Sequence, residues 1–365
     1  MSRIIMKILY ILDYFTPSKG WVERVFENII QHFSKNNQII ILTSRFSKDL
    51  PKIEYKENIK IIRVGKNRFF FTLWGTLKAL KIAKEVDLIH TSTYNWAYIT
   101  KFISIFHKKP VIITSHEIIG KNWYKFKWLF LWYIYKFLED IIYKNKNFFY
   151  VFVSKHVKNI ALSKYKIKKF NVIYNWLNLP HKIKKISKTE LWFKKNDIIG
   201  VFAGRPWRTK GLDFILQNFK DIKKINPNFK LLLILLEKQN SKKIQKIQKY
   251  LTKDIKVLYE IPHTQIYSYL NIADIWIVPS RSEWFWFTAL EFSLLWKKNL
   301  FSFVWAIPEI NFWDCHFFKP DDKIDFLNKI NEIFNWKKNN YSYNKKLTTE
   351  KMIRNYEKLY NKLVK

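Results

Sequence analysis

The chain has 365 residues, 48% of them apolar and 18% aromatic, which excludes a disordered protein and allows two hydrophobic cores of ordinary size. Its single cysteine, Cys315, excludes an internal disulfide bond and fits a reducing compartment. The formal net charge of +37 is extreme and leaves two explanations open. One is a polyanionic partner. The other is the codon bias of a low-GC genome, which would raise Lys, Ile, Asn, Tyr and Phe together.

The sequence contains no nucleic-acid-binding motif, so the polyanion that the charge would suit is an anionic membrane and not nucleic acid. The N-terminus runs into strand-like sequence without a signal-peptide cleavage site. No uncharged stretch is long enough to span a bilayer, because even residues Trp128–Tyr143 include Lys136, Glu139 and Asp140. We expect a cytoplasmic protein, and peripheral attachment to the inner face of the cell membrane is an open alternative.

Short apolar runs alternate with amphipathic helices over residues 1–178, a pattern typical of a parallel sheet with helices on both faces. After the first run, apolar side chains recur at helical spacing from Val22 to Phe33 and form a single stripe. These residues are therefore predicted to form a doubly wound N-terminal domain. Its predicted strands are Ile4–Leu12, Gln38–Thr43, Ile59–Val64, Val86–His90, Val111–Thr114 and Phe148–Val153.

Residues 179–196 are rich in Lys and Ser and lack a sustained period, so we predict an interdomain linker. The alternation resumes over residues 197–345, and residues 346–365 contain a helical pattern that is expected to pack back toward the N-terminal domain. The fold class is therefore α/β, with two Rossmann-like domains of doubly wound parallel sheets. In such sheets ligands bind beyond the carboxyl ends of the strands. The predicted strands of the second domain are Ile198–Ala203, Leu231–Leu236, Ile255–Tyr259, Ile275–Val278 and Leu300–Val304.

The richest motif, PSRSEWFWFTALE at residues 279–291, follows the strand around Ile277 and leads into a helix near Thr288. A helix N-terminus offers unpaired N–H groups and a positive dipole end, which suit a diphosphate. The acceptor-only carboxylates of Glu283 and Glu291 suit the hydroxyl groups of a sugar and a ribose. The alternative is structural, because Thr288 and Glu291 also have the spacing of a capping box.

A second motif, GRPWRTKG at residues 204–211, follows the strand Ile198–Ala203 directly. The cations Arg205 and Lys210 can hold a diphosphate and stabilise the charge that grows on a leaving nucleotide. A solvated basic turn is the alternative in so basic a chain. A weaker signal is Gly20, which lies between the first strand and its helix, where glycine lets the backbone approach a ligand closely.

These motifs, in this order, resemble the retaining family 4 glycosyltransferases of the GT-B fold over nearly the whole chain. The family's Gly-Arg-x4-Lys-Gly motif is present in full. Its Glu-x7-Glu motif is matched by Glu283 and Glu291. Other family positions are matched by Gly20 and Trp21 (a Gly-Gly pair), His116, Asn175 and Trp176 (an Asn-Gly pair), and Trp305, Ala306, Pro308 and Glu309 (a Gly-Gly-x-Pro-Glu segment).

The resemblance implies a nucleotide-diphosphate-sugar donor, a glycan or lipid-linked acceptor bound by residues 1–178, and a central cleft between the domains. It implies transfer of a hexosyl-type sugar with retention, in cell-surface polysaccharide or glycolipid synthesis, with no metal ion and no cofactor. The implied catalytic residues are His116, Glu283, Arg205 and Lys210. The implied donor-binding residues are Gly20, Arg205, Lys210, Glu283, Phe285, Phe287, Thr288 and Glu291. Asp274 is expected to be structural and His156 to be an ordinary surface residue.

The tryptophan content departs from this pattern. The chain has 7 Gly and 16 Trp, whereas average usage predicts roughly 26 Gly. Trp21, Trp176, Trp284, Trp286 and Trp305 stand where the family has glycine, and Trp296 is expected to do so too. An indole at a phosphate-contacting loop would block the ligand. We therefore expect that the gene uses UGA for glycine, as some bacterial lineages do, and that the printed sequence was translated with a code that reads UGA as tryptophan.

Two other function classes remain open from the sequence. An epimerase-like GT-B enzyme would handle a nucleotide sugar without transferring it, and a non-catalytic basic protein would bind a membrane or nucleic acid. Membrane contact is also compatible with an enzyme, because Asn122–Tyr150 interleaves lysines with aromatic residues. The alternative for that stretch is an ordinary core-packing helix with a lysine-rich outer face.

Overall fold

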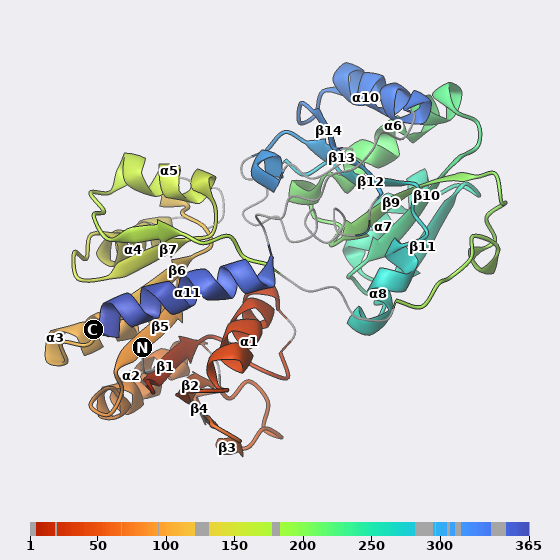
Figure 1. Cartoon of the computed structure of the whole chain (residues 1–365). Coiled ribbons are helices and arrows are strands. Elements are labelled where there is room, and N and C mark those ends of the chain that lie inside the picture. The colour runs from red at the N-terminus through yellow and green to blue at the C-terminus, as the bar shows by residue number, and fades with distance from the viewer. Residues whose placement is uncertain are drawn as a thin grey trace. The chain divides into compact units, whose positions relative to one another are not determined.

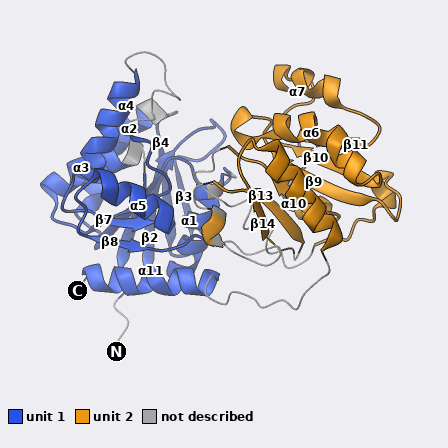
Figure 2. Cartoon of the chain, turned by 90° about the horizontal axis from the view of Figure 1, so that it is seen from above, with its two compact units in different colours: residues 1–177, 346–365 blue, residues 178–345 orange. Residues whose placement is uncertain are grey.

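A computed structural model describes residues 5–18, 20–66, 68–93, 95–120, 131–176, 183–281, 295, 297–304, 307–310, 315–336 and 348–364. The chain divides into two compact units (Figure 2). Unit 1 comprises residues 1–177 and 346–365, and unit 2 comprises residues 178–345.

Unit 1 contains an eight-stranded sheet in the order β3-β4-β2-β1-β5-β6-β7-β8 (Figure 1). All neighbouring strands are parallel except β3, which pairs antiparallel with β4 at the sheet edge. β1, β2, β5, β6 and β7 are almost wholly buried, as expected for strands covered by helices on both faces. The strands are β1 Lys7–Leu12, β2 Gln38–Ser44, β3 Ile53–Lys56, β4 Ile59–Val64, β5 Leu88–Ser92, β6 Val111–Ser115, β7 Phe149–Phe152 and β8 Phe170–Val172.

The helices of unit 1 follow the strands in doubly wound order. Their bounds are α1 Trp21–Phe33, α2 Arg68–Ala83, α3 Asn95–Phe106, α4 Leu131–Tyr143, α5 Lys155–Lys164 and α11 Thr349–Val364. In α1 the predicted apolar stripe is the buried face, with Val25, Phe26, Ile29 and Ile30 inaccessible to solvent.

The C-terminal helix α11 packs against the sheet of unit 1, although unit 2 separates it from that sheet in the sequence (Figure 2). A buried hydrogen-bond network joins it to three strands. The Tyr360 hydroxyl lies 3.1 Å from the Tyr10 hydroxyl and 2.5 Å from His90 Nδ1. His90 Nε2 lies 2.8 Å from Thr114 Oγ1, which in turn lies 3.1 Å from the Tyr356 hydroxyl. Satisfied polar groups of this kind specify one position for the helix on the sheet.

Unit 2 contains a six-stranded sheet in the order β11-β10-β9-β12-β13-β14, with all neighbours parallel (Figure 1). The strands are β9 Ile198–Gly204, β10 Phe229–Leu235, β11 Ile255–Tyr259, β12 Ile275–Val278, β13 Lys298–Ser302 and β14 Cys315–Phe318. The α-helices are α6 Leu212–Ile225, α7 Lys242–Ile247, α8 His263–Leu270 and α10 Lys323–Asn335. The short 3-10 turns are η2 Thr189–Leu191, η3 Arg208–Lys210, η4 Gln248–Tyr250 and η5 Ile307–Ile310.

Each predicted strand corresponds to a strand of the structure, and the prediction of two parallel-sheet α/β domains is confirmed. Three strands were not predicted, namely β3, β8 and β14. They have three or four residues each and, unlike the equally short β7 and β12, they are not fully buried, so no continuous apolar run marks them. Of the predicted linker, the part from residue 183 onward packs on unit 2. There Leu191 and Phe193 are buried and Lys188 Nζ donates to Asp274 Oδ2 at 2.7 Å.

Asp274 is structural, as predicted, because the same Oδ2 also accepts from the Ile199 backbone N–H at 2.8 Å. His156 differs from its prediction as a surface residue. It lies in the first turn of α5 and is part-buried, since this helix packs on the sheet through Val157 and Ala161.

Candidate active site

The basic loop between β9 and α6 packs directly against the carboxyl end of β12. Gly211 caps α6 in the left-handed region, with φ +69°. A Cβ atom at Gly211 would lie 2.0 Å from the Pro279 carbonyl oxygen, so only glycine fits. Because β9 and β12 are neighbouring parallel strands, the loops that follow them share one edge of the sheet.

Arg281 holds these two loops together. Its backbone N–H donates to the Thr209 carbonyl at 2.9 Å, and its Nη1 donates to the Arg208 carbonyl at 2.6 Å. The guanidinium also forms a bidentate pair with Asp213 in the first turn of α6, at 2.7 and 2.9 Å. The loop carrying Arg205 and Lys210 is thus fixed to the segment that leads into Glu283.

Arg281 also reaches a third segment of unit 2. Its Nε lies 2.8 Å from each carboxylate oxygen of Asp321, a residue held at φ +60° in the turn before α10. The hydrogen bond to Asp213, together with that to Asp321, raises the pKa of Arg281 further above its ordinary value. A role for Arg281 was not predicted from the sequence. An arginine two positions before Glu283 and an aspartate two positions after Gly211 were the available signals.

The two predicted donor-binding cations lie on this loop. Arg205 is exposed, and its guanidinium carbon lies 4.8 Å from the centre of the Trp207 ring. Lys243 Nζ lies 5.6 Å from the same ring, so a third cation lies near the loop. Lys210 is part-buried at the end of η3. Because Arg281 neutralises Asp213, the loop presents a net positive charge, which suits a diphosphate.

The acidic half of the predicted donor site lies outside the described residues. This applies to Glu283, Phe285, Phe287, Thr288 and Glu291, so their assignment as site residues, and the choice between ligand contact and helix cap for Thr288 and Glu291, stay predictions.

His116 lies at the carboxyl end of β6 in unit 1 and is buried. Its Nδ1 lies 3.4 Å from the amide nitrogen of Asn175, so two residues 59 positions apart that match family motifs meet here. Burial lowers the pKa of His116 to about 4. The imidazole is therefore neutral near pH 7 and can act as a hydrogen-bonding group without carrying a charge.

The buried carboxylate of Glu139, on α4, fixes the segment that follows His116. It accepts from the backbone N–H groups of Ile119 at 3.0 Å and Gly120 at 2.8 Å. Burial, and secondarily the Glu139 charge, raises the pKa of Glu117 to about 8. In the sequence Glu139 stands out only as an interruption of an apolar stretch, because its partners are backbone groups that composition does not reveal.

Gly20 is the N-cap of α1, which agrees with its predicted position between the first strand and its helix. A Cβ atom there would lie 1.9 Å from a Glu23 carboxylate oxygen, which means that this side chain folds back over Gly20. A diphosphate oxygen at this helix end would have to displace that carboxylate. The contact of Gly20 with the donor stays a prediction.

Over the described residues, no group of three or more His, Cys, Asp or Glu side chains could hold a metal ion. No helix in the same residues is both long enough and apolar enough to cross a bilayer. The predictions about metals and cofactors are left untested by these observations.

Several solved structures align with almost the whole chain. A sucrose-phosphate synthase from Thermosynechococcus elongatus has a TM-score of 0.72 at 16% identity, over 98% of this chain and 95% of its own. A glycosyltransferase from Rickettsia africae ESF-5 has a TM-score of 0.69 at 20% identity, over 99% of both chains. Anabaena HepE, solved in complex with UDP, has a TM-score of 0.67 at 14% identity, over 98% of this chain and 96% of its own. At these identities the likeness shows the fold, which is GT-B.

No curated protein sequence matches the chain. Two family models do. Residues 20–180 match Glycosyltransferase Family 4, and residues 183–293 match Glycosyl transferases group 1. The junction between the two matches lies close to the boundary between units 1 and 2. The chain belongs to the GT-B glycosyltransferases in which a family 4 N-terminal domain precedes a group 1 C-terminal domain.

Proposed function

We propose that the enzyme transfers a hexosyl group from a nucleotide-diphosphate sugar to a glycan or lipid-linked acceptor, with retention of anomeric configuration and without a metal ion. Cell-surface polysaccharide or glycolipid synthesis is the process we propose. The carrying observation is the junction of the β9–α6 and β12 loops through Arg281, which fixes Arg205 and Lys210 at one sheet edge. Solved neighbours support the donor class, since HepE binds UDP-glucose and a starch synthase IV from Arabidopsis thaliana binds ADP.

In the proposed mechanism the two loop cations stabilise most of the negative charge on the donor diphosphate. Arg205 and Lys210 hold the diphosphate and stabilise the negative charge that develops on the nucleotide as the glycosidic bond breaks. The acceptor hydroxyl attacks the anomeric carbon from the face that the nucleotide diphosphate leaves, and its proton passes to a phosphate oxygen of that leaving group. His116, neutral because it is buried, donates or accepts a hydrogen bond at a sugar hydroxyl, and Glu283 and Glu291 accept from donor hydroxyl groups.

A donor screen followed by a transfer assay tests the proposal. UDP-, ADP- and GDP-hexoses are screened by thermal shift on the chain with glycine at the family glycine positions, which is the native chain if UGA encodes glycine, and then on Lys210→Ala in the same background. Lys242→Ala, at an exposed lysine of α7, is the matched control. We expect one donor class to stabilise the native chain and the control but not Lys210→Ala.

Products distinguish the enzyme classes. Incubation of the selected donor with cell-surface glycans or lipid acceptors should release nucleotide diphosphate and give a product of unchanged anomeric configuration. Conversion of the donor to an epimer without acceptor would contradict the proposal, and so would equal donor binding by Lys210→Ala and the control.

We also propose that the enzyme works at the inner face of an anionic membrane. The net charge of +37 supports this, because each lysine near an anionic surface favours binding.

The UGA hypothesis gains a geometric argument from Trp192. This residue closes the turn η2 at φ +60° and is 80% exposed, so its backbone has the conformation that favours glycine and its indole fills no core. Trp276 is the opposite case, because it is wholly buried in β12 and a glycine there would leave a large cavity. Trp176 is buried and has no left-handed backbone, so its geometry does not require glycine.

We therefore propose that the codon at Trp192 and the codons at the family glycine positions are UGA and encode glycine, with the family pattern alone supporting this at Trp176. The codon at Trp276 should be UGG. Reading the codons of the gene tests this. UGG at Trp192, Trp284 and Trp286 would refute the hypothesis.

A further inference from the structure

Exposed apolar side chains are concentrated on three helices of unit 1. Among the described residues, eleven of the twenty-three large apolar side chains that are exposed belong to α2, α3 and α4. The helix α3 contacts both α2 and α4, so the three form one continuous surface (Figure 2). We call it the α2–α4 surface. Its exposed apolar residues are Phe70, Leu73, Trp74, Leu77, Phe102, Ile105, Phe106, Leu131, Tyr133, Ile134 and Phe137.

On α2 the exposed apolar residues form a helical stripe of their own. Phe70, Leu73, Trp74 and Leu77 recur at i, i+3, i+4 and i+7, and the last three are between 55% and 57% exposed. The other face of α2, which includes Phe71, is buried against the sheet. A helix that is apolar on two faces needs a second apolar environment, since a surface helix of a globular protein normally has one apolar stripe.

The charge on the α2–α4 surface is almost entirely positive. Neither α2 nor α3 contains an acidic residue. On α4, Glu139 is buried, and Asp140 is neutralised by Lys136 at 2.8 Å and Lys144 at 3.6 Å. The surface also carries the exposed lysines Lys78 and Lys81 on α2.

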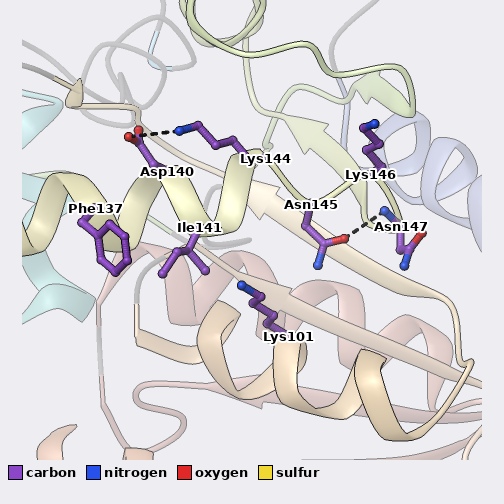
Figure 3. A pocket seen from close by; sticks show the side chains of 8 residues that line it. All are labelled: Lys101, Phe137, Asp140, Ile141, Lys144, Asn145, Lys146 and Asn147. Carbon is purple, nitrogen blue, oxygen red and sulfur yellow. Dashed lines mark hydrogen bonds and ion pairs between the residues drawn. The ribbon is translucent and has the colours of Figure 1, made fainter.

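A pocket of about 570 Å³ lies at the border of this surface (Figure 3). Phe137 and Ile141 of α4 form part of its wall, and it is also lined by Lys101 of α3 and by Lys144 and Lys146 of the segment between α4 and β7. Among the described residues, Lys101 and Lys146 form no ion pair with a carboxylate. Asp140 also lines the pocket and pairs there with Lys144 at 3.6 Å, so the net positive charge of the pocket comes from Lys101 and Lys146. Two ammonium groups at one pocket beside an apolar surface match a phosphate group attached to hydrocarbon.

We infer that the α2–α4 surface is a membrane-docking surface, in which the exposed apolar side chains enter the interface of an anionic bilayer and Lys101 and Lys146 hold a lipid phosphate. Basic and aromatic side chains on one helical surface bind such interfaces through apolar area and charge together. A second copy of the chain is a poor occupant, because two equally basic surfaces repel each other. The inference rests on the proposal that the enzyme works at a membrane and does not depend on sugar transfer.

Vesicle flotation tests the inference with no donor or acceptor present. The vesicles are phosphatidylcholine alone, or phosphatidylcholine and phosphatidylglycerol in a three-to-one ratio. Each lysine near an anionic surface contributes about fivefold to partitioning, so Lys101→Ala/Lys146→Ala should lower partitioning about 25-fold. Lys242→Ala/Lys246→Ala on α7 removes the same charge from unit 2 and should have a much smaller effect.

A second variant pair tests the apolar contribution. Leu77→Ser/Phe106→Ser should weaken flotation on anionic vesicles by at least tenfold, because each apolar side chain withdrawn from the interface loses its transfer free energy. The control, Leu236→Ser/Ile324→Ser, changes exposed residues of unit 2. Thermal melts confirm that each variant folds, and donor hydrolysis in solution should be unchanged.

The outcomes separate the two proposals. If the native chain does not float on anionic vesicles, membrane binding itself is wrong. If it floats and the surface variants float equally well, the membrane is bound by another surface and this assignment is wrong. A dimer in solution that these same variants convert to a monomer would instead identify the α2–α4 surface as a contact between copies.

Discussion

The substitution Arg281→Met would test whether one side chain organises the donor-binding edge of unit 2. It keeps most of the side-chain volume but removes every hydrogen bond to Asp213, Asp321 and the Arg208 carbonyl. Breaking a fully buried ion pair costs about 3–5 kcal/mol, whereas an exposed pair contributes about 1 kcal/mol or less. The Arg281 side chain is 22% exposed and Asp213 39%, so we expect a loss of about 2 kcal/mol in unfolding free energy.

The effect on the donor should exceed this loss of stability. Without the guanidinium, Asp213 becomes an uncompensated negative charge in the first turn of the helix that follows Lys210, and the loop loses its link to residues 279–281. We expect donor affinity to fall at least tenfold, and the melting temperature of a unit of this size to fall by about 4–8 °C. Arg281→Lys keeps the charge but not the planar fork, and should recover only part of the affinity.

Differential scanning calorimetry and equilibrium dialysis of the selected donor would measure the two quantities. The control is Lys323→Met, which breaks an exposed pair with Asp221 in the same unit and should change neither by much. If Arg281→Met bound the donor as well as the native chain while losing stability, Arg281 would be a structural residue only, and the proposed link between the loops and the donor would be wrong.

Three further predictions follow from individual residues. Lys210→Ala should reduce transfer by a factor of about 100 or more in a steady-state assay, with less than 1 kcal/mol lost in urea unfolding, because its positive charge acts on the leaving group. Trp192→Gly should raise stability by up to about 1 kcal/mol, because relief of the left-handed backbone exceeds the loss of the Lys256 contact at 3.6 Å; a clear loss of stability would contradict this. Burial lowers the pKa of His90 to about 3 and of His116 to about 4, so the unfolded state takes up protons first as the pH falls below 6.5. Each of the two histidines should then lower the unfolding free energy by about 1.4 kcal/mol per pH unit until the pH reaches its folded pKa. Between pH 7 and pH 5 the urea midpoint of His90→Gln should therefore fall less steeply with pH than that of the native chain.

The order of strands and helices could be predicted because each long strand carries a continuous apolar run and the helix α1 carries one clear stripe. Both signals depend only on which side chains are buried. The short strands β3, β8 and β14 were not predicted, because they form by pairing with a neighbouring strand and have no apolar pattern of their own.

At the candidate site, motif spacing and side-chain chemistry were enough to predict Arg205 and Lys210. Arg281 was found only in the structure, where it binds the loop that carries them. The clamp of Glu139 on Ile119 and Gly120 could not be predicted, since a carboxylate that accepts from two backbone N–H groups leaves no trace in the identities of its partners. The apolar side chains of α2 were predictable as a helix but not as an exposed surface, because only the fold shows which of two apolar stripes faces the sheet.

The network that fixes α11 explains why residues 346–365 belong to unit 1 although they follow unit 2. His90 is wholly buried in β5, and both of its ring nitrogens have partners, one of which is Tyr360. If the helix were removed, His90 and Thr114 would lose these hydroxyl partners and the Tyr10 hydroxyl would lose Tyr360, at a cost of several kcal/mol. The chain therefore leaves unit 1 and returns to it, and a truncation before Thr349 should destabilise the unit that holds His116, not the unit that holds Arg205 and Lys210. Separate unfolding transitions of the truncated chain would reveal this, and equal loss in both units would show that α11 does not stabilise unit 1 in the way its hydrogen bonds indicate.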